Sequence, residues 1–97
     1  MDIKLTARHF KLADGLREEA TKAAQKFERF YDNIISTEVI FMDEGTAENP
    51  KTVEYIVRID EHTLVAKEQG EDFVKLIHES SDKIIRQIRK IKTRQGV

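Results

Sequence analysis

The N-terminal third of the chain changes its hydrophobic period once. Apolar and polar residues alternate over residues 2–8, and this period of two predicts a half-buried β-strand. The apolar residues that follow recur at helical spacing; they are Leu16, Ala20, Ala23, Phe27 and Phe30. This second pattern predicts a helix over about residues 15–31, with Asp14 as its N-cap and Asn33 at its end.

The middle of the chain predicts three further strands. Residues 34–43 are rich in Ile, Val, Thr and Phe, and the polar segment 44–50 contains a glycine and a proline, which indicates a strand and a loop. Alternation resumes over 53–59, a short polar turn spans 60–62, and a further strand reaches Gly70. The side chains predicted to face the core are Ile35, Thr37, Val39, Phe41, Val53, Tyr55, Val57, Ile59, Leu64 and Ala66.

The C-terminal segment predicts one long helix. Asp72 is a suitable N-cap, and apolar positions recur at helical spacing until about Thr93. The apolar stripe consists of Phe73, Ile77, Ile84, Ile88 and Ile91. The predicted order is therefore β-α-β-β-β-α, in which a helix makes the first two strands parallel and hairpins make the others antiparallel. We expect an α+β fold: a four-stranded mixed sheet with two parallel helices on one face.

Length and composition exclude several classes of protein. The 97 residues suffice for one domain with a modest core, which excludes a multidomain enzyme. The absence of cysteine excludes disulfides and thiolate metal sites and fits a reducing compartment. No apolar run reaches the length of a signal peptide or a membrane span. We therefore expect one domain over residues 1–97, soluble, cytoplasmic and without contact with a membrane.

Charge is unevenly distributed, although the formal net charge is only -1. No acid occurs from Lys83 onward, and cations recur in a row along each predicted helix. The rows consist of Lys22, Lys26 and Arg29 in the first helix and of Lys83, Arg86, Lys90 and Arg94 in the second. Both rows are offset from the apolar stripe in the same rotational sense. In parallel helices they should therefore lie on a common surface, as a double basic track.

The alternative is a solvated helix surface whose charges only keep the protein soluble. Glu18, Glu19 and Glu28 could pair with the first row. The C-terminal part of the second row, Lys90 and Arg94, has no acid within four positions. The repulsion between these like charges is therefore not compensated locally. Phosphates would supply the missing negative charge.

Both helical segments also resemble the sequence patterns of a known family. Residues 15–34 begin with Gly-Leu-Arg-Glu and end with Lys-Phe-Glu-Arg-Phe-Tyr-Asp-Asn-Ile. This is similar to the leucine-arginine start and the K-[LF]-E-x-[YFW] ending of ribosome hibernation promoting factors. After Gly70, the chain resembles the family's D-[MF]-[YV]-x-x-I, [DN]-K-[LI]-x-[RK]-Q and terminal lysine. The matching residues are Asp72, Phe73, Ile77, Asp82, Lys83, Arg86, Gln87 and Lys90.

The resemblance implies the βαβββα fold and a ribosome-associated translation inhibitor that acts in hibernation under stress. It implies binding to 16S rRNA in the decoding channel of the small ribosomal subunit, where the protein would obstruct mRNA and tRNA. The RNA-binding residues carried over from the family pattern are Arg17, Lys26, Lys83, Arg86 and Lys90. Four further candidates rest on helix geometry alone: Lys22, Arg29, Arg89 and Arg94.

The chain also departs from the family pattern. Its net charge is slightly negative, and Glu19 places an acid near the first basic row. The long form of the family carries a C-terminal dimerisation domain, which we do not expect in a chain that ends at Val97. We therefore expect a monomer away from the ribosome.

Catalysis and metal binding are not expected. His9, His62 and His78 are far apart and form no i, i+4 ligand pair. Adjacent acids at 43–44, 60–61 and 71–72 lie at turns or helix ends, where they do not face each other as an acid–base pair must. We assign Phe27, Phe30 and Phe73 to the core and not to base stacking. The sequence thus predicts no enzyme, no cofactor, no metal and no small-molecule substrate.

A different class of function remains open. Ile40, Met42 and Ile56 should point to the sheet face away from the helices, where they could form a small apolar patch. The alternative function is therefore a protein-interaction module of the sigma-54 modulation type that uses the open sheet face. An RNA binder loses affinity steeply with salt, whereas a partner held by apolar contacts does not.

Overall fold

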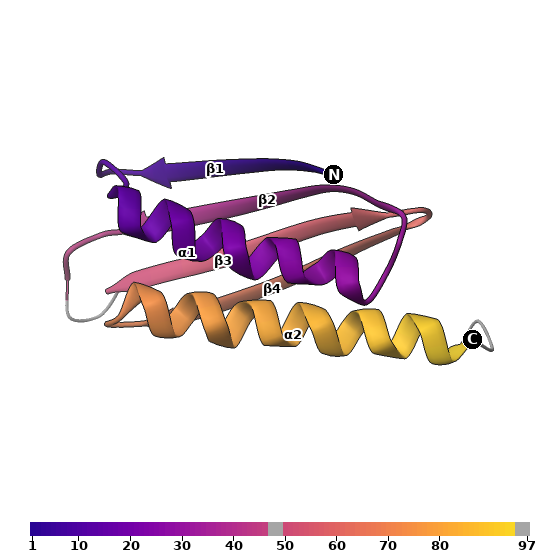
Figure 1. Cartoon of the computed structure of the whole chain (residues 1–97). Helices are drawn as coiled ribbons and strands as arrows, with labels where there is room; N and C mark the ends of the chain where they lie inside the picture. The colour runs from indigo at the N-terminus through magenta and orange to yellow at the C-terminus, as the bar shows by residue number, and fades with distance from the viewer. Residues whose placement is uncertain (47–49, 95–97) are drawn as a thin grey trace.

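The computed structural model describes residues 1–46 and 50–94 and confirms the predicted order of elements (Figure 1). The elements are β1 (Asp2–Arg8), α1 (Asp14–Gln25), the 3₁₀ turn η1 (Lys26–Arg29), β2 (Ile34–Asp43), β3 (Lys51–Ile59), β4 (His62–Gly70) and α2 (Phe73–Arg94). The strands form a mixed sheet in the order β1-β2-β3-β4. As predicted, β1 is parallel to β2, and the other neighbours are antiparallel.

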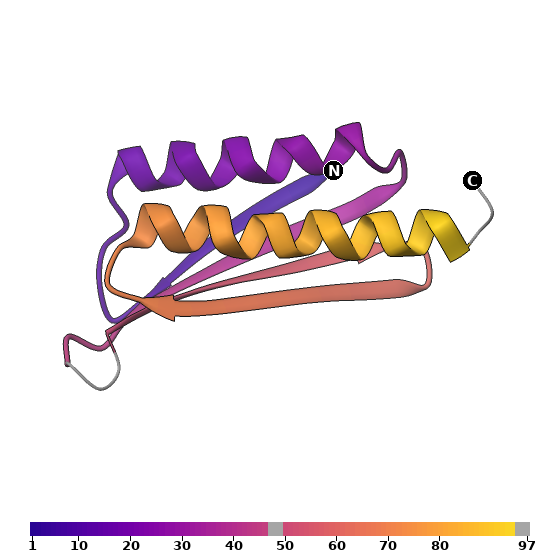
Figure 2. The ribbon, with the colours of Figure 1, turned by 90° about the horizontal axis from the view of Figure 1, so that it is seen from below.

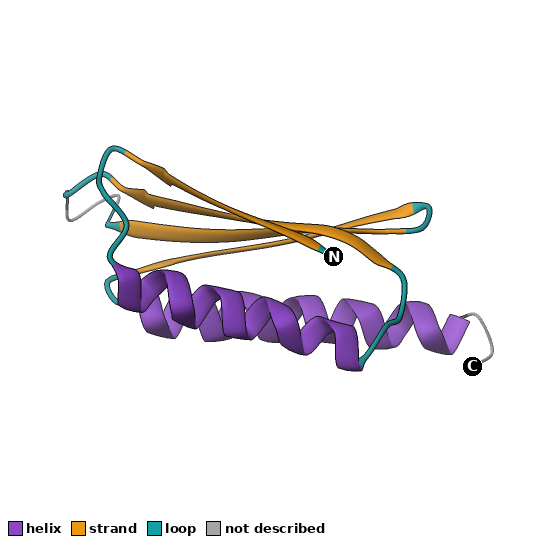
Figure 3. Cartoon of the chain, turned by 45° about the horizontal axis from the view of Figure 1, so that its top comes forward, coloured by secondary structure: helices purple, strands orange, loops and turns teal. Residues whose placement is uncertain are grey.

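Both helices cover the same face of the sheet (Figure 3) and run in the same direction (Figure 2). Two contacts fix their relative position. His78 Nε2 lies 3.1 Å from Glu19 Oε1, and the guanidinium of Arg89 lies 5.2 Å from the ring centre of Phe30. In each contact the residue in α2 follows its partner by 59 positions, so the two helical segments keep a constant register. The parallel helix layer expected from the sequence is confirmed.

The core lies between this helix layer and the sheet, and the two helices fill it differently. Ile77, Ile84 and Ile88 of α2 are fully buried, as the apolar stripe predicted. The buried residues of α1 are small: they are Ala20, Ala23 and Ala24. Small side chains let a helix approach a sheet closely, and the Tyr55 hydroxyl of β3 donates a hydrogen bond of 3.1 Å to the Ala20 carbonyl oxygen.

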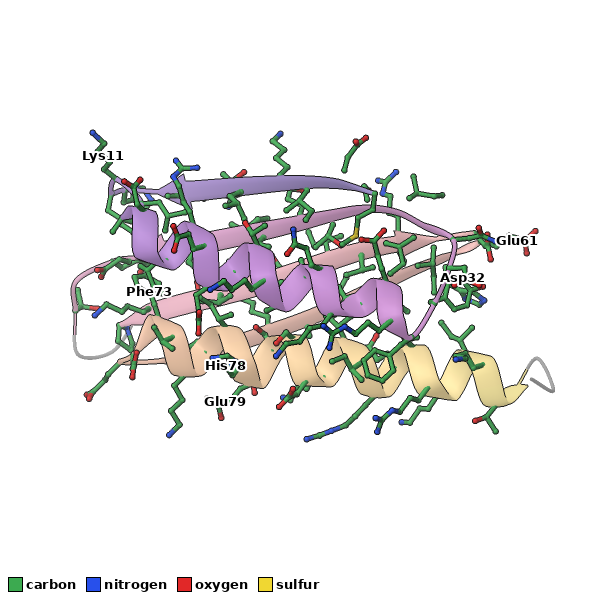
Figure 4. The ribbon with its side chains drawn as sticks, viewed as in Figure 1. Lys11, Asp32, Glu61, Phe73, His78 and Glu79 are labelled. Atoms are coloured by element: carbon green, nitrogen blue, oxygen red, sulfur yellow. The ribbon has the colours of Figure 1, made fainter. Side chains whose placement is uncertain are left out.

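An aromatic cluster fixes the start of α2, where Phe73 lies (Figure 4). The Phe73 ring stacks on Phe10 with 5.3 Å between ring centres and meets Phe41 edge-on at 5.6 Å. Asp72 caps the helix as predicted, because its Oδ1 accepts a hydrogen bond of 3.0 Å from the Val74 backbone N–H. Burial and capping therefore begin α2 at the same point.

The first helix starts within one residue of the prediction, but its predicted N-cap and its predicted end were wrong. The N-cap is Ala13, which has an extended backbone and no side-chain cap hydrogen bond. Asp14 lies inside the first turn instead, where its carboxylate still faces the positive end of the helix dipole. The α-helix ends at Gln25 and tightens into η1, whereas the sequence predicted a continuous helix to about residue 31. The tighter turn buries Phe27 and leads the chain toward β2.

One predicted core residue was also misplaced. The pairing of β2 with β3 shifts register between Ile34 and Ser36, as at a β-bulge. Ile34 is therefore buried, and the side chain of Ile35 is 58% exposed. The other side chains predicted to face the core from β2, β3 and β4 are buried.

Candidate nucleic-acid interface

Three cations of the first helical segment form an exposed cluster. Lys22 belongs to α1, and Lys26 and Arg29 belong to η1. All three side chains are exposed, and with Gln25 they line a shallow pocket of about 260 Å³. The spacing predicted from the sequence thus brings these three cations together.

Two of the three acids that could have neutralised this cluster, Glu19 and Glu28, are engaged elsewhere, and Glu18 lies beside Lys22 without an ion pair to it. Glu19 contacts His78 of α2 at 3.1 Å, and Glu28 lies 3.6 Å from the amine of Met1. Within residues 1–46 and 50–94, no ion pair shorter than 4.0 Å includes a member of the cluster. Its positive charge is therefore available to a ligand.

One part of the second row faces the edge of the sheet. Lys83 Nζ lies 2.8 Å from Glu68 Oε1 of β4, and Gln87 Nε2 donates a hydrogen bond of 3.0 Å to the Val65 carbonyl oxygen. Lys90 follows Lys83 by seven residues and is exposed on the same side of α2. This flank lies away from α1, and the charge of Lys83 is partly compensated by Glu68.

Arg86 and Arg89 lie progressively closer to α1. Arg89 reaches Phe30 at the end of the first helical segment, and Arg86 lies between Lys83 and Arg89 around the helix axis. Both arginines are exposed. The two predicted rows therefore share the outer surface of the helix layer but do not adjoin along their whole length. Arg89, which was predicted from helix geometry alone, is the α2 cation that reaches the first helical segment.

The two remaining candidates lie at the ends of this surface. Arg17 is exposed near the start of α1, where it lines a second shallow pocket of about 260 Å³ with Glu18, Thr21 and Lys22. The backbone of α2 extends to Arg94, but the side chain of Arg94 lies outside the described part of the structure. We refer below to the exposed cations Lys22, Lys26, Arg29, Arg86, Arg89 and Lys90 as the basic surface.

Comparison with known proteins identifies the family. Residues 3–96 match the family described as Sigma 54 modulation protein / S30EA ribosomal protein. The chain belongs to this family. It is a family of ribosome-associated factors and not an enzyme family, so the resemblance seen in the helical motifs is confirmed. No curated protein matches the chain in sequence.

Solved structures show the same fold as this S30EA-family chain. A ribosomal subunit interface protein from Coxiella burnetii has a TM-score of 0.84 at 24% identity, and the match covers 96% of this chain and 99% of that one. The Protein Y N-terminal domain from Thermus thermophilus has a TM-score of 0.80 at 21% identity, with coverage of 94% and 99%. These similarities extend over nearly the whole sheet and helix layer.

The helix layer of this family member is electrically polarised along its length. Acids occur in the N-terminal halves of both helices. One of them is Glu79 of α2, which follows His78 (Figure 4). Cations dominate the C-terminal halves, and the parallel arrangement brings these halves to the same end of the molecule (Figure 2). Cations at helix C-termini also interact favourably with the helix dipole, so part of this pattern serves helix stability. The dipole explains Lys22, which lies in the last turn of α1, but it does not explain Arg86, which lies about two turns before the end of α2.

The open sheet face has a different character. Ile40, Met42 and Ile56 are only half-buried there, as predicted. The cross-strand neighbours of Ile40 and Ile56 include the acids Glu54 and Glu38, respectively, which interrupt the apolar surface. The patch is therefore divided, and it offers an apolar partner less continuous area than the sequence suggested.

Within residues 1–46 and 50–94, no group of three or more His, Asp or Glu side chains could hold a metal ion. Burial raises the pKa of the Tyr55 hydroxyl, and the nearby charge of Glu19 adds to the effect, so Tyr55 stays neutral and serves as a hydrogen-bond donor. No helix within the described ranges is long and apolar enough to cross a membrane.

Proposed function

We propose that this protein binds 16S rRNA of the small ribosomal subunit through the basic surface and inhibits translation during ribosome hibernation. The observation that carries the proposal is the cluster of Lys22, Lys26 and Arg29, which is exposed and which no ion pair of the described residues includes. Phosphates are the ligands that such a cluster recognises, and membership in a family of ribosome-associated factors makes rRNA their source. A role on the ribosome implies the cytoplasm.

The finer proposal concerns where the protein binds and what it blocks. Binding in the decoding channel would obstruct mRNA and tRNA by occupying their space, without any chemical step. All nine cations predicted from the sequence remain proposed contacts, with Arg17, Lys83 and Arg94 at the margins of the surface. We also propose that residues 1–97 act as one ribosome-binding unit that is monomeric away from the ribosome, which sedimentation velocity would test.

Sedimentation with purified small subunits tests the main proposal. The variant carries Lys26→Glu, Arg29→Glu and Arg86→Glu. Its matched control carries the same change of net charge on the opposite side of the molecule. The control substitutions are Lys4→Glu, Arg8→Glu and Lys67→Glu, all at exposed positions of β1 and β4.

The parent and the control should sediment with the small subunit, and the helix-layer variant should not. Binding of the parent should weaken steeply with salt, because each neutralised phosphate releases counterions. Failure of the parent to bind any ribosomal particle at low salt would refute the proposal. Equal loss of binding in both variants would show that only overall charge matters. Competition with mRNA and tRNA on the same subunits tests the location in the decoding channel.

A further inference from the structure

Phe30 differs from the other phenylalanines predicted to lie in the core. Phe27 and Phe73 are buried, whereas Phe30 packs against the core but remains partly exposed. The guanidinium of Arg89 lies over its ring at 5.2 Å from the ring centre, within the range of a cation–π contact. The assignment of Phe30 to the core was therefore incomplete, because its ring also supports a cation of the basic surface.

The backbone around Phe30 is held on both sides. The Phe30 N–H donates a hydrogen bond of 3.0 Å to the Phe27 carbonyl oxygen, which closes η1. The next residue, Tyr31, donates from its hydroxyl to Asp60 Oδ2 in the β3–β4 turn at 2.5 Å. The ring is thus a fixed support, and Arg89, which is exposed, loses less conformational freedom when a ligand binds to it.

A supported guanidinium can do more than attract phosphate. Its planar face stacks on nucleobases, which single-stranded RNA exposes and a duplex hides between neighbouring base pairs. Lys26 lies one helical turn before Phe30, and Lys26 and Arg29 line one shallow pocket, so cations for the flanking phosphates come from the same short segment as the ring. The ring that supports Arg89 and the two phosphate-binding cations therefore belong to η1 and its C-cap residue.

We infer that Arg89, supported by Phe30, stacks on an unpaired RNA base while Lys26 and Arg29 hold the neighbouring phosphates. The inference rests on the proposed function and narrows the preferred ligand to RNA with unpaired bases. In a purely structural role, Arg89 would cover the Phe30 ring and contribute only charge to binding. The two roles differ when the bases are removed from the RNA and the phosphates are kept.

The experiment compares two RNA hairpins, one with an unpaired loop and one in which the loop positions are abasic. Affinity is measured for the parent, for Arg89→Lys and for Phe30→Leu. Arg89→Lys keeps the charge but removes the planar group, and Phe30→Leu keeps an apolar side chain under residue 89. Arg58→Lys is the matched control, since it makes the same exchange at an exposed position of β3, between two buried residues and therefore on the sheet face away from the helices.

The parent should bind the abasic loop roughly tenfold more weakly than the natural loop, since one stacked base contributes about 1–3 kcal/mol. Arg89→Lys should bind both hairpins equally and keep the salt slope of the parent, because no phosphate contact is lost. Phe30→Leu should reduce the difference between hairpins, and Arg58→Lys should preserve it. Thermal melting verifies that each variant folds.

Two results would overturn the inference: equal binding of both hairpins by the parent, or an unchanged preference for bases in Arg89→Lys. Sedimentation with small subunits, run in parallel, separates this failure from that of the proposed function. A parent that binds the subunit but ignores loop bases disproves the stacking role alone. A parent that binds neither subunit nor RNA disproves both.

Discussion

The two helical segments that cover the sheet differ in how they pack against it and in how their cations are paired. α2 inserts large isoleucines between itself and the sheet, whereas α1 lies on alanines. On the outer surface, the described contacts bind Lys83 of α2 into an ion pair with Glu68 and leave Lys22, Lys26 and Arg29 of the first segment outside such pairs. Arg86, Arg89 and Lys90 of α2 also remain outside such pairs, so α2 provides the larger buried side chains while both segments contribute exposed cations to the basic surface.

This difference has a physical consequence. Buried apolar area sets most of the free energy of unfolding, and exposed charges change that energy little. Substitutions inside α2 should therefore alter stability, and substitutions on the outer surface of α1 and η1 should alter binding. The following experiments test this division, beginning with the largest expected change in stability.

The largest effect is expected in the interior of α2. Ile88→Ala should lower the free energy of unfolding by about 2–4 kcal/mol, because Ile88 is fully buried and its truncation leaves a cavity. Val74→Ala in the same helix is the control, since Val74 is 41% exposed and should cost much less. Denaturant titration measures both values, and equal costs would mean that α2 does not anchor the core as described.

A smaller effect is expected beneath α1. Ala24→Leu should destabilise the protein by about 1–3 kcal/mol, because Ala24 is fully buried and extra methyl groups must displace its neighbours. The matched exchange Gln25→Leu places the same side chain at the next, exposed position and should leave the melting temperature nearly unchanged. If Ala24→Leu were also neutral, α1 would lie further from the sheet than the structure indicates.

The hydrogen bond beneath α1 should show both a mutational and a pH effect. Tyr55→Phe removes the donor to Ala20 and should cost about 0.5–1.5 kcal/mol at neutral pH. The raised pKa of Tyr55 means that the unfolded chain releases this proton first, near pH 10. Stability should therefore fall above about pH 10 in the parent and fall less in Tyr55→Phe. Urea titrations at several pH values measure the free energy of unfolding of both proteins. If this energy fell equally in the parent and in Tyr55→Phe above about pH 10, the buried hydrogen bond of Tyr55 would not be the cause.

Much of this fold could be predicted from local sequence patterns. Alternation identified the strands, and helical spacing with Asp72 located α2, because these features depend on neighbours a few residues away. The bulge that exposes Ile35 could not be predicted, since it depends on pairing with β3. The change from α1 to η1 likewise depends on how Phe27 and Tyr31 are held by distant residues.

In the candidate site, too, local spacing could be predicted and contacts between distant segments could not. Helical spacing correctly grouped Lys22, Lys26 and Arg29, because a single helical segment determines their separation. The partners of the α2 cations were not predictable, since Glu68 belongs to another strand and Phe30 lies 59 positions before Arg89. The sequence therefore predicted which cations are exposed, but not which of them are already paired.

The smallest expected change in stability separates two lysines that the sequence placed in equivalent rows. Lys83→Gln removes the ion pair with Glu68, which is a partly exposed pair and should contribute no more than about 1 kcal/mol. Lys26→Gln removes a charge that no described ion pair engages and should leave stability within about 0.5 kcal/mol.

The same two substitutions should affect ribosome binding in the opposite order, with the larger effect from Lys26→Gln. Lys26→Gln should flatten the slope of log affinity against log salt by about one unit, as expected for one lost phosphate contact. Lys83→Gln should change the slope less, because Glu68 already compensates its charge and because it faces the flank of β4. Equal slopes for the two variants would show that α2 presents its charge to RNA as fully as the first helical segment does.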